Sequence, residues 1–75
     1  MLGKDFKYIR FKKFMTQEYV AEMIGISRFA LSWYEQERSE MPITTVLRLI
    51  RLYNISNSEF EEYIQKWKNA DKSKE

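Results

Sequence analysis

Three short segments of the sequence carry the same pair of helix-start signals, and these constrain the fold more than any other feature. In each segment an apolar residue precedes a serine or threonine, and a second apolar residue follows four positions after that hydroxyl. The hydroxyl can accept a hydrogen bond from an amide of the first helical turn, while the two apolar side chains pack across the helix start. The apolar pairs are Met15 and Val20 around Thr16, Ile26 and Leu31 around Ser27, and Ile55 and Phe60 around Ser56. The chain is therefore predicted to start several short helices.

The helix after Ser56 has a further signal, because Glu59 follows three residues later and predicts a capping box. This helix is expected to run from about Asn57 to Trp67. A helix from about Lys4 to Lys13 precedes the three marked starts, with Phe6 and Ile9 on one face. Another begins near Pro42 and carries an apolar stripe formed by Ile43, Val46, Leu47 and Ile50. With only two glycines and one proline and no alternation typical of strands, the sequence predicts an all-α domain of five short helices.

Composition limits the class of protein. The 75 residues contain no cysteine and no histidine, so we expect no disulfide, no metal site and no cofactor. The same absence, with no glycine-rich phosphate loop and no paired carboxylates in an apolar pocket, argues against an enzyme that turns over a small-molecule substrate. No apolar run is long enough for a signal peptide or a membrane span, which favours a cytoplasmic protein. We expect one domain over residues 1–67 and a polar tail over residues 68–75.

The formal net charge is only +2, yet the charges are unevenly distributed. Residues 1–30 hold six basic and three acidic side chains, whereas residues 31–62 hold three basic and six acidic ones. A basic end is compatible with nucleic-acid binding, although such an asymmetry also occurs in ordinary solvated surfaces. Lys7, Lys12 and Lys13 are open to either interpretation.

The segment from Thr16 to Gln36 has the spacing of two helices that cross over a tight turn. Ala21 is small where the two helices would approach most closely, and Gly25 stands where the chain must adopt a left-handed conformation to leave the first helix. In the second helix, from about Ser27 to Gln36, Leu31 and Tyr34 fall inward. The outward positions are Arg28, Phe29, Ser32, Trp33 and Gln36. An exposed face with two large aromatic residues indicates a surface that binds a partner.

These residues resemble the Cro/C1-type (XRE-type) helix-turn-helix family of bacterial and phage regulators, over about Phe6 to Phe60. The positions that match its motif are Thr16, Gln17, Val20, Ala21, Gly25, Ile26, Ser27, Leu31, Ser32 and Glu35. The start LGKDFKYIR and the stretch SWYEQERSEMPITTVLRLI through NISNSEF look most like the N-terminal domains of Rgg/MutR-type regulators. The resemblance implies a compact five-helix, lambda-repressor-like domain of bacterial or phage origin that regulates transcription by binding double-stranded DNA, in a repressor-like way.

The resemblance also implies roles for individual residues. Arg28 and Phe29 would contact base edges in the major groove, with Ser32 and Trp33 one turn further along. Phosphate contacts are expected from Thr16, Gln17, Ser27, Gln36, Arg38, Ser39, Thr44 and Thr45. Arg10 and Glu35 match a family pair that resembles a partly buried structural ion bridge. The family usually has glycine where this chain has Glu37, which with Glu40 would lie near phosphate and suggests a locally different loop.

Apolar residues outside the motif allow two interpretations. Tyr8, Phe11 and Phe14 could form a contact surface, but they are predicted to be core, since aromatic side chains of small domains are usually buried. Tyr63, Ile64 and Trp67 form a stripe with Phe60 that either lengthens the core or makes a two-fold dimer contact, and the dimer is favoured. A homodimer would bind a palindromic operator with half-sites about 34 Å apart. The alternative function is a protein-interaction module, such as an antirepressor, that uses Phe29, Trp33, Tyr63 and Trp67 to bind a protein partner.

Overall fold

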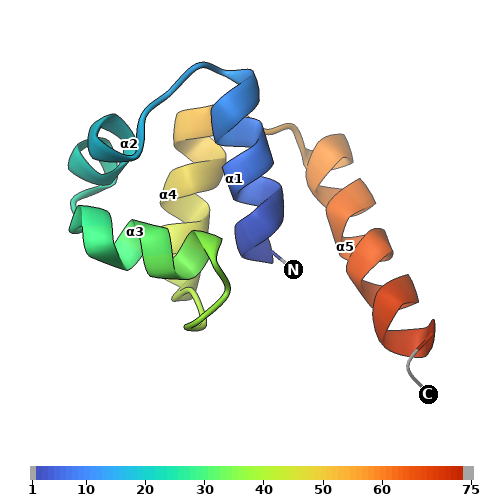
Figure 1. Ribbon diagram of the computed structural model, residues 1–75. Coiled ribbons are helices and arrows are strands. Elements are labelled where there is room, and N and C mark those ends of the chain that lie inside the picture. Colours follow the sequence, from blue (N-terminus) through green and yellow to red (C-terminus); the bar gives the residue numbers. More distant parts are fainter. Residues whose placement is uncertain (1, 74–75) are drawn as a thin grey trace.

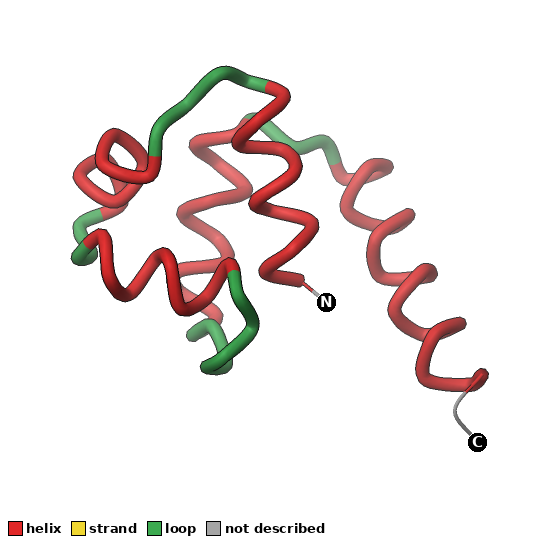
Figure 2. The backbone as a smooth tube through the Cα atoms, in the orientation of Figure 1, coloured by secondary structure: helices red, strands yellow, loops and turns green. Residues whose placement is uncertain are grey.

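The computed structural model describes residues 2–73, which form five α-helices joined by loops (Figure 1). These are α1 (Leu2–Lys12), α2 (Gln17–Ile24), α3 (Arg28–Glu35), α4 (Ile43–Tyr53) and α5 (Asn57–Ser73). Figure 2 shows only helix and loop over this part of the chain. The all-α fold class predicted from the sequence is confirmed.

The three marked helix starts form the predicted backbone caps. Thr16 Oγ1 accepts a hydrogen bond from the amide of Tyr19 at 3.1 Å, and Ser27 Oγ accepts one from the amide of Ala30 at 3.0 Å. Ser56 Oγ accepts a bond from the amide of Glu59 at 3.1 Å. The hydroxyl of Ser56 also donates to the Glu59 carboxylate at 3.5 Å. Local side-chain chemistry therefore determines where α2, α3 and α5 begin.

Three helix boundaries differ from the sequence prediction. Helix α1 begins at Leu2 instead of Lys4, and α5 continues to Ser73, so residues 68–73, expected in the polar tail, are helical. Pro42 precedes α4 with φ −59° and ψ 147°, so it lies outside the first turn. Helix α5 extends past its apolar stripe because helical backbone bonding can continue through polar residues without a packed face. Helix α1 begins earlier because Leu2 packs against the core and Gly3 is buried.

Helices α1 and α4 lie side by side in the centre, with α2 and α3 on one side and α5 on the other (Figure 1). The core is apolar and draws on α1 to α4 and on the loop between α4 and α5. It consists of Phe6, Ile9, Val20, Ala21, Ile24, Leu31, Val46, Leu49, Tyr53 and Ile55. Helix α5 approaches this core through Phe60 and Tyr63, which are half-buried. No helix formed by residues 2–73 is long and apolar enough to cross a membrane.

The prediction that Tyr8, Phe11 and Phe14 are core is wrong, whereas Phe6 is buried in the core. Tyr8 is 60% exposed, Phe11 58% and Phe14 95%. The buried face of α1 consists of Gly3, Phe6, Ile9 and Arg10, so Tyr8 and Phe11 point away from it. Their rings instead lie beneath cations: Lys12 Nζ is 5.0 Å from the Tyr8 ring centre, and the Arg10 guanidinium carbon is 4.8 Å from that of Phe11.

The apolar stripe predicted for the fourth helix is only half correct. Val46 is buried and Ile50 is half-buried, but Ile43 and Leu47 are 68% and 58% exposed. The buried side of α4 is instead formed by Thr45, Val46, Leu49 and Tyr53. Tyr53 was missed because its ring reaches the Phe6 ring of α1, with 6.1 Å between ring centres, a contact that the sequence of α4 alone does not reveal.

Candidate nucleic-acid interface

Helices α2 and α3 are joined by a three-residue turn, residues 25–27, with Gly25 in the left-handed region at φ 76°. The amide of Gly25 bonds the carbonyls of Ala21 and Glu22, which closes the end of α2. Arg48 of α4 closes the same helix end from outside, since its Nη1 donates to the carbonyl of Ile24 at 2.9 Å. Ala21 is 3% exposed, as expected for a small residue at a helix crossing. The turn is therefore fixed by backbone bonds and by one arginine from α4.

Helix α3 has one buried side and one exposed side. Leu31 and Glu35 are 1% and 2% exposed, whereas Phe29 and Trp33 are 80% and 54% exposed. Arg28 and Gln36 are also exposed, and Ser32 is half-buried and accepts a hydrogen bond from Gln36 Nε2 at 2.8 Å. The structure thus gathers the residues expected to contact bases on the outward side of one short helix.

A buried polar network holds the far end of α3. Arg10 Nε donates to Glu35 Oε2 at 2.7 Å, and Arg10 Nη2 donates to Oε1 at 3.0 Å. Arg10 Nη1 also donates to the carbonyl of Met15 at 3.0 Å, just before α2. The hydrogen bond with Glu35 raises the pKa of Arg10, against the opposing effect of burial. Arg10 and Glu35 are 5% and 2% exposed, so the pair fixes α1 against α3 in the interior.

Gln17, expected to contact phosphate, joins this network. Its Nε2 donates to Glu35 Oε1 at 2.9 Å, and the side chain is only half-buried. The amide nitrogen carries two hydrogens, so one donor remains for a partner outside the protein. Gln17 is the first residue of α2, where the helix dipole favours an anion. The buried pair therefore also orients a side chain at the surface.

The hydroxyl of Tyr53 lies in the same interior region without a hydrogen-bond partner among the described residues. Tyr53 is 1% exposed. Burial raises the pKa of its phenol far above the ordinary value, the nearby Glu35 carboxylate raises it further, and Arg10 opposes the shift. Tyr53 is thus kept neutral beside the charged pair.

The remaining phosphate candidates divide into exposed and buried positions. Thr16 and Ser27 are exposed while their hydroxyls cap α2 and α3. Other exposed candidates are Gln36, Arg38, Ser39 and Thr44. Thr45 is 6% exposed and faces the core, so its proposed phosphate contact is wrong. The error arose because Thr44 and Thr45 look alike in sequence, although adjacent residues of a helix point about 100° apart.

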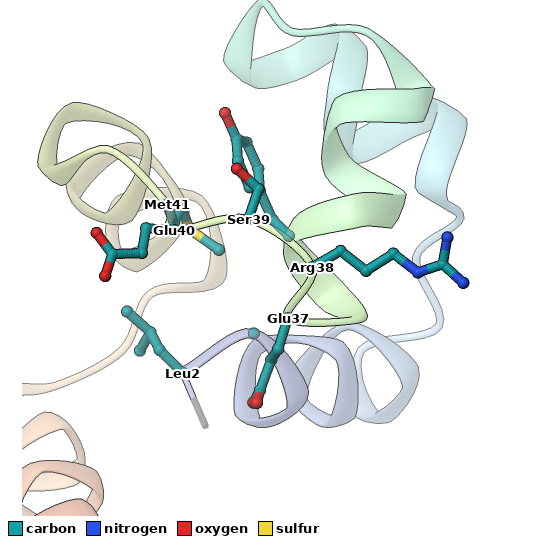
Figure 3. A pocket seen from close by; sticks show the side chains of 8 residues that line it. Leu2, Glu37, Arg38, Ser39, Glu40 and Met41 are labelled. Carbon is teal, nitrogen blue, oxygen red and sulfur yellow. The ribbon is translucent and has the colours of Figure 1, made fainter.

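The loop between α3 and α4 keeps the conformation that a glycine would favour. Glu37 has φ 60°, in the left-handed region that glycine adopts readily. Its carboxylate accepts a bond from the amide of Lys4 in the first turn of α1 at 3.4 Å. Figure 3 shows a pocket between this loop and the start of α1, with the side chains of Arg38 and Glu40 pointing in opposite directions. The carboxylate of Glu37 is thus directed toward α1.

Glu18 is a residue at this surface that sequence reasoning missed. Its carboxylate lies 3.2 Å from Arg28 Nε, and both side chains are 62% exposed. The pair joins the first turn of α2 to the first residue of α3. No helical spacing connects residues ten positions apart across a turn, so only the acidic first turn of α2 hinted at the role of Glu18.

The residues expected at a dimer contact lie on α5. Tyr63 and Ile64 are half-buried, and Tyr63 packs against the core of its own chain, where burial raises the pKa of its phenol. The side chain of Trp67 lies outside the described residues. Among the side chains that are described, no group of three or more acids could hold a metal ion.

Comparisons with known proteins agree with this geometry. A helix-turn-helix family model matches residues 6–60. The chain is 34% identical over 58 residues to the HTH-type transcriptional regulator PuuR of Escherichia coli (strain K12), covering 77% of this chain and 31% of PuuR. It is 40% identical over 55 residues to the HTH-type transcriptional regulator ImmR of Bacillus subtilis (strain 168), covering 73% of this chain and 43% of ImmR. No solved structure matches the chain significantly.

The chain thus spans less than half the length of these curated relatives. The matched region contains α2, α3 and the turn between them, together with α4 and most of α1. The matches concern the Cro/C1 type of domain and do not address the Rgg/MutR subfamily, which stays a prediction.

Proposed function

This chain belongs to the Cro/C1-type helix-turn-helix family, and we propose that it is a sequence-specific DNA-binding transcriptional regulator that inserts α3 into the major groove of an operator. The observation that carries the proposal is the exposed outer side of α3, with Arg28, Phe29 and Trp33 on a helix held from behind by the Arg10–Glu35 pair. A rigid support is needed because base edges are recognised only when the donors arrive in a fixed register.

Each side chain on this surface has a chemistry suited to duplex DNA. Arg28 can donate two parallel hydrogen bonds to the O6 and N7 atoms of guanine, and Phe29 can contact a thymine methyl. Ser32 and Trp33 lie one turn further along the same side. Side chains suited to phosphate, which would fix the register of α3 without reading sequence, are those of Thr16, Gln17, Gln36, Arg38 and Ser39.

We further propose that the regulator acts in a repressor-like way by occupying a palindromic operator as a homodimer, in the cytoplasm and with no cofactor. Tyr63 and Ile64 on α5 remain the candidate contact, since α5 lies on the side of the molecule opposite α2 and α3 (Figure 1). Binding of such a homodimer to one duplex requires that the two-fold axis present both α3 helices toward the same face of the DNA.

The test is selection of a duplex from a randomised library with the purified chain, followed by titration against a scrambled duplex at two salt concentrations. We expect the selected duplex to bind at least about 10³ times more tightly than the scrambled one, and both to weaken as salt rises. Equal and weak binding of both duplexes would contradict the proposal.

Arg28→Ala tests the role of the recognition helix in the same titration. Loss of the guanine contact should weaken binding to the selected duplex by about 1–3 kcal/mol. Lys68→Ala on α5 is the matched control, because it also removes one exposed positive charge and should change binding little. Equal losses in the two variants would mean that Arg28 acts only through its charge.

The alternative is a protein-interaction module on the same scaffold, favoured by the exposure of Phe29 and Trp33. Trp33→Ala distinguishes the two functions when Arg28→Ala is measured beside it. If the chain binds DNA, its function should depend mainly on Arg28. If it is an interaction module, Trp33→Ala should abolish binding to the protein partner and Arg28→Ala should not.

A further inference from the structure

The exposed side of the recognition helix carries a single charge. Helix α3 contains one basic residue, Arg28, and one acidic residue, Glu35, which is buried. Arg28 is the first residue of the helix, where the helix dipole disfavours a cation. Its position is therefore unfavourable for α3 alone, and the neighbouring structure must compensate for it.

Glu18 supplies that compensation from α2. Its carboxylate lies 3.2 Å from Arg28 Nε, while the rest of the guanidinium remains exposed to solvent, since the side chain is 62% accessible. Contact through Nε leaves the two terminal nitrogens of the guanidinium as donors. The carboxylate is also negative, at a surface expected to face phosphate.

We infer that Glu18 is a positioning residue for specificity: it holds Arg28 ready to read a base and repels DNA in which that base contact cannot form. This inference rests on the proposed function. On DNA with the correct base, the hydrogen bonds from Arg28 offset the nearby negative charge of Glu18. On other DNA the carboxylate remains close to phosphate without compensation, so non-specific binding is weakened. Specificity then comes from a repulsive element as well as an attractive one.

The experiment uses Glu18→Gln, which keeps the shape of the side chain and removes its charge. Glu22→Gln is the matched control, because Glu22 is an exposed acid one turn further along α2. The full chain and its variants are titrated with the duplex selected by the unsubstituted chain and with a scrambled duplex. We expect Glu18→Gln to bind the scrambled duplex about threefold more tightly, with a similar loss of discrimination between the two duplexes. Glu22→Gln should change discrimination less.

The double variant Glu18→Gln with Arg28→Ala separates positioning from general charge. If Glu18 acts through Arg28, its substitution should no longer change discrimination once Arg28 is absent. Repeating the library selection with Glu18→Gln should relax base preference at the same operator position as Arg28→Ala. Unfolding measured on each variant should show no large change in stability, as expected for an exposed pair.

Two results would overturn the inference while leaving the proposed function intact. One is an equal change in discrimination for Glu18→Gln and Glu22→Gln, which would indicate a long-range charge effect. The other is an undiminished Glu18→Gln effect in the Arg28→Ala background. Failure of the proposed function is a different result: the unsubstituted chain itself would bind the selected and the scrambled duplex equally.

Discussion

The two ends of α3 each carry an ion pair, and the two pairs differ in burial and in the distance between their charged atoms. At the last residue, Glu35 meets Arg10 of α1 at 2.7 Å with both side chains buried. At the first residue, Arg28 meets Glu18 of α2 at 3.2 Å with both side chains mostly exposed. Because water screens the exposed pair and leaves the buried one unscreened, the Arg10–Glu35 pair contributes to the stability of the fold. The Arg28–Glu18 pair is the one that we propose acts in recognition.

The largest expected effect comes from breaking the buried pair. Glu35→Ala leaves the Arg10 guanidinium buried without its counter-charge and also frees Gln17, so the free energy of unfolding should fall by about 3–5 kcal/mol. Urea denaturation measures this loss, with the exposed Glu61→Ala as control. A loss below about 1 kcal/mol would show that the buried Arg10–Glu35 pair is no more costly to disrupt than an exposed ion pair.

The buried contact between α1 and α3 should also not tolerate a larger side chain. A Cβ atom on Gly3 would overlap the carbonyl oxygen of Tyr34, which belongs to backbone and cannot rotate away. Gly3→Ala should therefore lower the free energy of unfolding by about 1–3 kcal/mol, despite the better helix propensity of alanine. Lys4→Ala, at an exposed neighbouring position, is the control. An increase in the free energy of unfolding on Gly3→Ala would show that α1 and α3 can move apart without cost.

Alkaline pH probes the same interior through Tyr53. Burial raises the pKa of this phenol in the folded state, so the unfolded state releases the proton first as pH rises. Stability should be fully present below about pH 10 and fall above it, by about 1.4 kcal/mol between about pH 9 and about pH 11. In Tyr53→Phe this part of the pH dependence should disappear. An unchanged alkaline profile would mean that other groups, such as Tyr63, cause the loss.

The smallest effect on stability is expected at the exposed end. Arg28→Ala should change the free energy of unfolding by less than about 0.5 kcal/mol, because an exposed pair contributes little and a cation at a helix start is unfavourable. The same denaturation assay measures it. A loss approaching that of Glu35→Ala would remove the distinction between a structural and a recognition end of the helix.

Local sequence predicted the elements of the fold better than it predicted what each helix packs against. Thr16, Ser27 and Ser56 mark helix starts because each hydroxyl bonds an amide only three residues away. Tyr8 and Phe11 were misassigned because their hydrophobicity does not specify which side of α1 meets α4. Thr45 was misassigned because its residue type, shared with Thr44, does not specify which side of α4 is buried.

For the candidate interface too, the sequence predicted features within one helix and missed contacts between helices. Its outward residues follow from helical spacing on α3, and the exposure of Phe29 and Trp33 agrees with that spacing. The contacts that join helices were not predictable in this way. The Glu18–Arg28 pair, the Arg48 bond to the end of α2, and the approach of Gly3 to Tyr34 all depend on the angle at which two helices cross.

The sequence by itself determined where α2, α3 and α5 start, where α2 ends, and which side of α3 is exposed, because these depend on interactions within a few residues. The tertiary structure alone decided which aromatic residues are exposed and which acid meets Arg28. It also decided that Gln17 bonds to Glu35. These contacts join segments distant in sequence, and they form only when packing of the apolar core fixes the helix crossings.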